Sequence, residues 1–159
     1  DLASIFKILA TFNFNILFTY ANADLGGRII NQSIENFCKV NPQKYIVVKN
    51  LGQVKYLSAM KHVDLLIGNS SSGVIEAASF KKAVVNIGNR QKGRLKSQNV
   101  IDCNIFSLYE SIELALSDNF KDKINNIENI YGTGKTADFI VEKLIKTPLS
   151  IIKKFRDQT

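Results

Sequence analysis

Short apolar runs alternate along the chain with segments in which apolar residues recur every three or four positions. The runs predict β-strands at 15–20, 45–49, 63–68, 83–87 and 99–102. Helical spacing lies between and around them, at 2–9, 30–38, 54–60, 74–80, 107–116 and 135–146. The middle three strands are almost continuously apolar, as in strands covered on both faces. Strands that alternate with helices form right-handed βαβ units, so we predict an α/β fold with a Rossmann-like, doubly wound parallel sheet.

The chain has 159 residues, which suits a single domain of ordinary size. We expect this domain to occupy residues 1–147. Pro148 separates it from a basic stretch, 148–159, which we expect to form a C-terminal amphipathic helix. The chain opens with Asp1 and with a helix that no strand precedes, so we take it for part of a longer protein.

Composition narrows the class of partner. Apolar residues make up 45% and charged residues 22%, and the net charge of +7 favours an anionic partner such as nucleic acid, a membrane surface or a phosphorylated small molecule. No apolar run approaches the roughly 20 residues that span a bilayer, and no signal peptide is visible. Cys38 and Cys103 are expected to be buried thiols in a reducing cytoplasm. His62 stands alone, at a junction of helix and strand, so we expect a structural role for it and neither a metal nor a cofactor.

The segment 68–76 (GNSSSGVIE) carries the strongest functional indication. A buried strand is expected to end at its first glycine and a helix to begin at about Gly73, which places Ser70, Ser71 and Ser72 at a helix N-terminus. Free backbone N–H groups and the helix dipole favour an anion there, so the segment predicts a phosphate site. The alternative is that one serine caps the helix and the other two are solvated.

Glu76 is expected in the first turn of that helix, one turn from the serines. Its carboxylate can accept hydrogen bonds from both hydroxyls of a ribose, as acids do in nucleotide sites of this fold class. It can equally compensate the helix dipole. A serine capping box is excluded because the residue three positions before Glu76 is Gly73.

The next strand leads into a strongly basic loop, 86–96 (NIGNRQKGRLK). Guanidinium groups suit phosphate because they donate hydrogen bonds in a planar fork. In an α/β sheet this loop can lie beside the serine-rich one. The alternatives are a solvated basic loop and a nucleic-acid patch, although no aromatic residue is interleaved to stack on bases.

Loops after the first two strands offer further ligand contacts. In 20–28 (YANADLGGR), Asn22 or Asp24 is expected to cap the next helix, and the glycine pair allows a ligand to approach the backbone. Residues 50–52 (NLG) can present backbone groups to the flat edge of a base. The segment 131–134 is predicted to be a turn and not part of a P-loop, because the pattern's first glycine is absent.

Together these loops resemble the UDP-N-acetylglucosamine 2-epimerases, especially their hydrolysing branch. The matching segments are 22–28, 51–57, 68–76, 86–94 and 130–134, in order along most of the chain. The resemblance implies the C-terminal half of a GT-B-like enzyme whose active site lies between two Rossmann-like halves. It implies a UDP-sugar substrate, an N-terminal half as partner and a homodimer at full length, with neither nucleic acid nor membrane bound.

The resemblance also implies roles for individual residues. The positions that match the family's UDP site are Asn22, Asp24, Leu51, Ser70, Ser71, Ser72, Glu76 and Arg90. The serines and Arg90 would bind the diphosphate, and Glu76 would bind the ribose hydroxyls. Asn22 would face the nucleotide, and the backbone at Leu51 would contact uracil. Arg28 and Arg94 are candidates for a secondary or allosteric site.

The chemistry of the family removes a proton at C2, eliminates UDP from C1 to leave a glycal, and adds water. UDP-N-acetylglucosamine then gives N-acetylmannosamine and UDP for sialic-acid-type sugars. The family's acid–base carboxylates and its substrate-facing histidine match nothing in this chain, so we expect UDP binding here without catalysis. Ala21 and Asn89 replace the family's usual Pro and Asp, which affects loop rigidity.

Other functions remain open at this point. They are a hydrolysing 2-epimerase for a UDP-diacetamido sugar, half of a UDP-dependent glycosyltransferase, a basic nucleic-acid-binding module, and a free-standing UDP-binding subunit.

Overall fold

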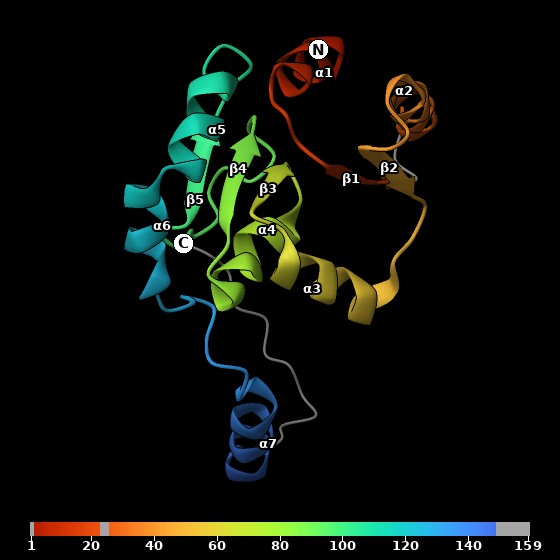
Figure 1. Cartoon of the computed structure of the whole chain (residues 1–159). Coiled ribbons are helices and arrows are strands. Elements are labelled where there is room, and N and C mark those ends of the chain that lie inside the picture. The colour runs from red at the N-terminus through yellow and green to blue at the C-terminus, as the bar shows by residue number, and fades with distance from the viewer. Residues whose placement is uncertain (1, 23–25, 149–159) are drawn as a thin grey trace, which may run out of the picture.

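The structure is a computed structural model that describes residues 2–22 and 26–148 (Figure 1). Its strands are β1 (Ile16–Thr19), β2 (Tyr45–Val48), β3 (Leu65–Gly68), β4 (Ala83–Ile87) and β5 (Val100–Cys103). All five predicted strands are confirmed to within two residues at each end. The predicted alternation of strands and helices therefore describes the chain correctly.

The helices are α1 (Leu2–Thr11), α2 (Gly27–Val40), α3 (Gly52–His62), α4 (Ser71–Ile75), α5 (Leu108–Leu116), α6 (Asp118–Asn125) and α7 (Thr136–Lys146), with a 3₁₀ helix η1 (Ala77–Phe80). Two of them differ from expectation. The helix predicted at 74–80 is divided at Glu76 into α4 and η1. The pattern did not indicate α6, because this short polar helix buries only Phe120 and Ile124.

The strands form two parallel sheets and not one continuous sheet. β1 pairs with β2, with Ile16 opposite Tyr45, and β4 lies between β3 and β5. Within the described residues no hydrogen bonds join β1 to β3, so the expectation of a single sheet is wrong in this respect. Figure 1 shows the β1–β2 pair apart from the larger sheet, with α3 between β2 and β3. Every strand pairing is parallel and helices flank the sheets, so the Rossmann-like α/β class is confirmed.

Both faces of the larger sheet are covered, and β4 shows this residue by residue. Ala83 and Val85 point into a core that contains Leu108 and Ile112 of α5. Val84, between them, packs in a second cluster with Met60 and Ala77, from α3 and η1. Successive side chains of a strand point to opposite faces, so a strand buried on both sides must be apolar throughout. This explains the apolar run from Ala83 to Val85 at the start of β4.

Aromatic contacts connect α1 to both sheets. Phe37 of α2 stacks on Phe6 of α1, with ring centroids 4.5 Å apart, and on Tyr45 of β2 at 4.7 Å. At the other end of α1, the ring of Phe12 lies 4.9 Å from that of Tyr109 in α5. Leu9 is buried in the core of the larger sheet. α1 therefore packs against α2 and α5 and holds the two sheets in one fold.

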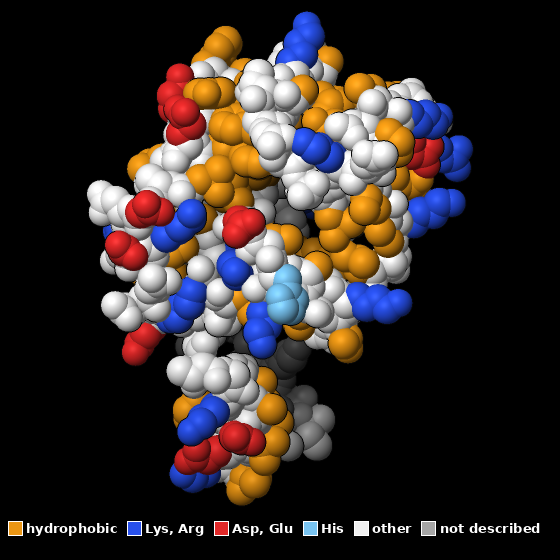
Figure 2. Space-filling model, in the orientation of Figure 1, with side chains coloured by type: hydrophobic (Ala, Val, Ile, Leu, Met, Phe, Trp, Pro, Cys, Tyr) orange, Lys and Arg blue, Asp and Glu red, His pale blue; other side chains and the backbone are white. Residues whose placement is uncertain are grey.

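α7 stands away from the rest of the described chain (Figure 1), and none of its residues is buried. Its apolar side chains are Phe139, Ile140, Val141, Leu144 and Ile145, each more than half exposed. Figure 2 shows hydrophobic side chains at the surface of the part that extends below the body. The expected turn before it is confirmed, with Gly132 and Gly134 at positive φ. Of the helix expected at 148–159, only Pro148 is described.

Candidate functional site

The serine-rich segment forms the turn between β3 and α4. α4 begins at Ser71, so the prediction of a start at Gly73 is wrong by two residues. Ser70 is the N-cap residue, and its hydroxyl accepts a hydrogen bond from the N–H of Ser72 at 3.3 Å. Gly73 is buried inside the helix, where an added Cβ would lie 3.1 Å from Val84 Cγ1. The first helical turn thus packs directly on the sheet.

The three serines have different surroundings. Ser70 caps the helix. The alternative interpretation of this segment, in which one serine caps the helix and the other two are solvated, predicted such a cap. Ser72 is half-buried and donates its hydroxyl to the carboxylate of Glu76. The hydroxyl of Ser71 is also half-buried and has no hydrogen-bond partner among the described residues. Ser71 is therefore the serine whose hydroxyl is most available to a ligand at this turn.

Glu76 does not lie in the first turn of the helix, as the sequence pattern suggested. It is the C-cap residue of α4, and its N–H donates to the carbonyl of Ser72 at 2.8 Å. The early start and early end of α4 together cause this difference. One helical turn still separates the serines from Glu76, and the hydrogen bond from Ser72 holds its carboxylate beside them.

The basic loop between β4 and β5 lies against the serine-rich turn. Gln91 is 2% exposed, and its Nε2 donates to the carbonyl of Asn69 at 2.7 Å, one residue before the capping serine. The N–H of Gly88 donates to the carbonyl of Cys103 at 2.9 Å and ties the start of the loop to β5. Arg90 and Arg94 are exposed on this loop. The expectation that these two loops are neighbours is therefore confirmed.

Sequence reasoning gave Gln91 no role, although its side chain joins the two loops. A buried amide with a hydrogen bond to backbone costs little, whereas an unpaired one is costly. Asn86 is also a buried amide: it is 1% exposed in β4, and its Nδ2 donates to the carboxylate of Asp102 at 2.7 Å. A polar residue inside an otherwise apolar strand was the pattern that could have identified Asn86.

A third segment, 129–131, joins the serine-rich turn to the basic loop. Nδ2 of Asn129 donates to the carbonyl of Ile75 at 2.8 Å and to Oγ of Ser79 at 2.7 Å. The hydroxyl of Tyr131 donates to the carbonyl of Leu95 at 2.7 Å. Asn129 thus contacts the end of the serine-rich segment, and Tyr131, in the 130–134 motif, contacts the basic loop.

A separate pocket of about 430 Å³ lies between the loops that follow β1 and β2. Its lining includes Asn22 and Leu51, together with Tyr20, Lys49 and Tyr56. The carboxylate of Glu35 accepts a hydrogen bond from Tyr20, which is the largest of the effects that raise the pKa of that phenol, so Tyr20 is a neutral donor near pH 7. Residues of both loops therefore line one pocket.

Glycine shapes the wall of this pocket. An added Cβ at Gly27 would lie 2.3 Å from the carbonyl oxygen of Asn22, so only glycine fits there. The N-cap residue of α2 is Gly26, with no capping side chain, so neither Asn22 nor Asp24, one of which was expected to cap this helix, is its N-cap residue. Instead Oδ1 of Asn31 accepts the N–H of Ala21 at 2.8 Å.

The remaining predicted positions are placed as follows. Arg28 is exposed on the first turn of α2, and Asp24 lies outside the described residues. No described hydrogen bond or ion pair joins the pocket at Asn22 to the serine-rich turn, so the structure gathers the predicted residues into two groups.

The described residues hold neither a metal cluster nor a reactive thiol. Across residues 2–22 and 26–148, His, Cys, Asp and Glu nowhere gather in the threes that could hold a metal ion. Cys38 and Cys103 are free, and burial raises the pKa of each thiol, which keeps both protonated near neutral pH. None of the described helices has both the length and the apolar character needed to cross a membrane.

The parallel strands and the polar loops at their carboxyl ends define an α/β domain of the Rossmann-like class. A family model described as UDP-N-acetylglucosamine 2-epimerase matches residues 1–145. The chain therefore belongs to the UDP-N-acetylglucosamine 2-epimerase family.

Relatives with assigned names support this membership. A GDP/UDP-N,N'-diacetylbacillosamine 2-epimerase (hydrolyzing) of Campylobacter jejuni is 45% identical over 122 residues, which cover 76% of this chain and 32% of that protein. A UDP-N,N'-diacetylbacillosamine 2-epimerase (hydrolyzing) of Legionella pneumophila is 36% identical over 141 residues, 89% of this chain and 36% of that protein. The matched region thus spans about a third of the length of these relatives.

A solved structure shares the fold. The UDP-GlcNAc 2-epimerase of Methanocaldococcus jannaschii, in complex with UDP-GlcNAc and UDP, superposes with a TM-score of 0.70 at 19% identity. The match covers 92% of this chain and 40% of that one. The arrangement of strands and helices is therefore that of one part of a larger enzyme.

Proposed function

We propose that this chain forms the UDP-binding part of a hydrolysing 2-epimerase that acts on a UDP-linked 2-acetamido sugar. One observation carries the proposal: the hydrogen bond from Gln91 to Asn69 holds the basic loop against the serine-rich turn, beside Glu76. Hydroxyls, a carboxylate and guanidinium groups thus meet at one edge of a sheet in a member of the epimerase family. Together they match the chemistry of a nucleoside diphosphate.

We assign the diphosphate to the serine-rich turn and to Arg90, because hydroxyls and a guanidinium fork both donate to phosphate oxygens. Ser70 and Ser72 shape the turn through their own hydrogen bonds, and Ser71 offers a half-buried hydroxyl. Glu76 accepts the ribose hydroxyls from its place one turn further along. Its hydrogen bond from Ser72 fixes the carboxylate in advance, which lowers the cost of ordering it on binding.

The pocket that Asn22 and Leu51 line is our candidate for the uracil ring. The hydrogen bond from Gly52 N–H to Oδ1 of Asn50, at 2.7 Å, fixes the turn at Leu51, and all three residues line the pocket. We assign Asp24 to the same side of the nucleotide, and Arg28 and Arg94 to secondary contacts.

In the reaction proposed for the whole protein, UDP leaves C1 after proton removal at C2, and water adds to the resulting glycal. Negative charge builds on the diphosphate as the C1–O bond breaks. Fixed hydrogen-bond donors at that position stabilise the charge of the transition state more than they stabilise the bound substrate. They therefore lower the barrier to departure of UDP. This chain would supply the leaving-group site, and the acid–base groups would come from the remainder of the protein.

The relatives at 45% and 36% identity are named for a diacetamido sugar, which favours such a substrate over UDP-N-acetylglucosamine. The groups that distinguish the two sugars lie on the ring, away from UDP. Product analysis of the whole protein with each UDP-sugar would decide between them. A sugar 2-epimer and free UDP are expected from the preferred substrate, whereas transfer to an acceptor would instead indicate a glycosyltransferase.

We further propose that the rest of the protein covers α7, whose exposed apolar side chains would otherwise face water. The matched relatives extend well beyond the region that this chain covers, which leaves ample chain to pack there. For the whole protein we propose a cytoplasmic location, since Cys38 and Cys103 are both free thiols, and a homodimer, as the resemblance to the family implies.

Isothermal calorimetry with UDP tests the site. Ser71→Ala and Glu76→Ala should each weaken binding by about tenfold, the value of one or two lost hydrogen bonds. Ser33→Ala, on α2, removes a serine whose hydroxyl bonds only to the helix backbone and is the matched control. Equal affinity for wild type and both site variants would overturn the assignment.

A further inference from the structure

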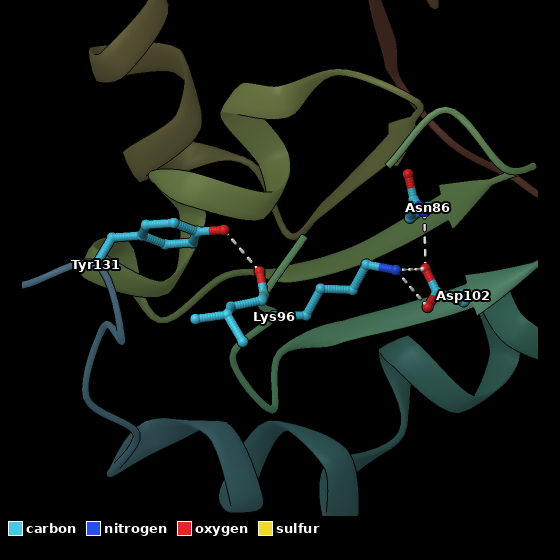
Figure 3. A network of polar contacts seen from close by, with 5 residues as sticks. Asn86, Lys96, Asp102 and Tyr131 are labelled. Carbon is cyan, nitrogen blue, oxygen red and sulfur yellow. Dashed lines mark hydrogen bonds and ion pairs between the residues drawn. The ribbon is translucent and has the colours of Figure 1, made fainter. Parts of the chain in front are cut away.

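Asp102 is the centre of a polar network at the carboxyl ends of β4 and β5 (Figure 3). Its Oδ1 accepts hydrogen bonds from Nδ2 of Asn86 at 2.7 Å and from Nζ of Lys96 at 2.9 Å, and its Oδ2 accepts a second from Lys96 at 2.6 Å. Asn86 and Asp102 lie opposite each other in the parallel register. One carboxylate therefore joins two strands to the basic loop, which contains Lys96.

The ammonium group of Lys96 is held within this network by its ion pair with Asp102. Its side chain is 21% exposed, and in Figure 3 its ammonium group points at Asp102 along the sheet edge. Burial raises the pKa of Asp102, but the hydrogen bonds from Lys96 and Asn86 outweigh it and leave this pKa below its usual value. The carboxylate of Asp102 is thus ionised at neutral pH. The charge of Lys96 is thus paired inside the loop, whereas Arg90 and Arg94 are exposed at its surface.

The residues on either side of Lys96 are also fixed. The carbonyl of Leu95 accepts the hydroxyl of Tyr131, and Oγ of Ser97 accepts the N–H of Ile130 at 3.3 Å. Three consecutive residues therefore anchor the C-terminal end of the basic loop. Gln91 anchors the other end against the serine-rich turn.

We propose that Lys96 and Asp102 are positioning residues, whose ion pair sets the basic loop so that Arg90 meets the diphosphate, and that Lys96 makes no contact with the nucleotide. This inference rests on the proposed function, since it takes UDP as the ligand of this edge. The loop holds four basic residues in seven positions, and the structure separates them: Lys96 orders the loop, whereas the arginines face outward.

The test is a double-mutant cycle on UDP affinity, measured by calorimetry on this chain. Lys96→Met removes the cation and keeps the stem, and Asp102→Asn removes the charge but keeps an acceptor for Asn86. We expect each variant, and the double variant, to weaken UDP binding by the same factor of about ten, because all three lose the same pair. Lys96→Arg preserves the pair and should bind UDP as wild type does. Lys146→Met, which breaks the ion pair with Glu142 on α7, is the matched control and should change nothing.

Binding of uridine, which lacks the diphosphate, distinguishes a displaced basic loop from general damage to the fold. A displaced basic loop affects only the diphosphate, so the affinity for uridine, followed by NMR titration, should be the same in wild type and variants. A parallel loss of uridine and UDP affinity would overturn the positioning role. So would a further loss of UDP affinity when Lys96→Met is added to Asp102→Asn, because it would show direct contact between Lys96 and phosphate. If wild type binds UDP and both variants bind it with the same affinity as wild type, this inference alone is refuted. If wild type binds no UDP, the proposed function itself is refuted.

Discussion

Gly27→Ala tests whether the backbone of the predicted base pocket is as tightly built as the structure shows. Gly27 is the first residue of α2 and has a negative φ, so alanine suits its backbone conformation. Helix propensity alone predicts a stabilisation of about 1 kcal/mol. The added Cβ, however, would lie 2.3 Å from the carbonyl oxygen of Asn22.

A carbon and a carbonyl oxygen normally approach no closer than about 3.3 Å, so the 2.3 Å contact requires a shift of about 1 Å. Overpacking against backbone costs about 1–3 kcal/mol, which outweighs the gain in propensity and leaves a net loss of about 1 kcal/mol in the free energy of unfolding. The shift moves Asn22, which lines the pocket. UDP affinity should therefore fall by about fivefold, equivalent to about 1 kcal/mol.

Urea unfolding gives the change in stability, and calorimetry gives the UDP affinity. Val40→Ala is the control: Val40 is 76% exposed at the end of the same helix, so alanine there changes helix propensity without crowding the pocket. A Gly27→Ala protein that is more stable than wild type and binds UDP equally well would refute the reasoning, because helix propensity would then be the only effect.

Three further results are expected. Gln91→Met removes the hydrogen bond to the carbonyl of Asn69, so the free energy of unfolding should fall by about 1 kcal/mol and UDP affinity should fall more than uridine affinity; equal losses for the two ligands would contradict this. Glu76→Gln should weaken binding of UDP more than binding of 2'-deoxy-UDP, as measured by calorimetry, because the deoxy ligand lacks one of the two hydroxyls assigned to the carboxylate; equal losses for the two ligands would be contrary to the assignment. Asp102→Asn should lower the free energy of unfolding near pH 7, because the ionised carboxylate stabilises the fold. In acid-unfolding curves, the difference from wild type should shrink as the pH falls below about 3.9, the usual pKa of an unfolded Asp, and should vanish once the pH is below the lowered pKa of Asp102. A difference that persists at pH 2 would contradict the last prediction.

The sequence pattern indicated the strands and the long helices correctly because their apolar faces repeat regularly. It failed where local geometry depends on contacts distant in sequence. Because Ser70 caps α4, the helix begins at Ser71 and ends before Glu76, its C-cap residue. The carboxylate of Glu76 therefore lies at the C-terminal end of the helix and not in its first turn, where the sequence pattern placed it. The division of the strands into two sheets is a matter of tertiary packing, which strand patterns do not encode.

The candidate site was predicted in part. Serine, glutamate and arginine were identified because their side chains are the usual ligands of nucleotides. Gln91 and Asp102 were missed because their roles depend on what they contact across the fold, namely a carbonyl 22 residues away and a lysine of the neighbouring loop. Buried amides of this kind have no periodic pattern, and only the polar position of Asn86 within an apolar strand could have suggested one.

The most direct test of the central claim is an NMR titration of the ¹⁵N-labelled chain with UDP. We predict that amide shifts change most at the serine-rich turn and the basic loop, 69–76 and 88–94, with a second group around Leu51. The contrary result would be changes confined to the hollow of about 570 Å³ that Lys81, Lys82 and Lys121 help to line, away from these loops, or no change at all. Either outcome would show that the serine-rich turn does not bind the diphosphate.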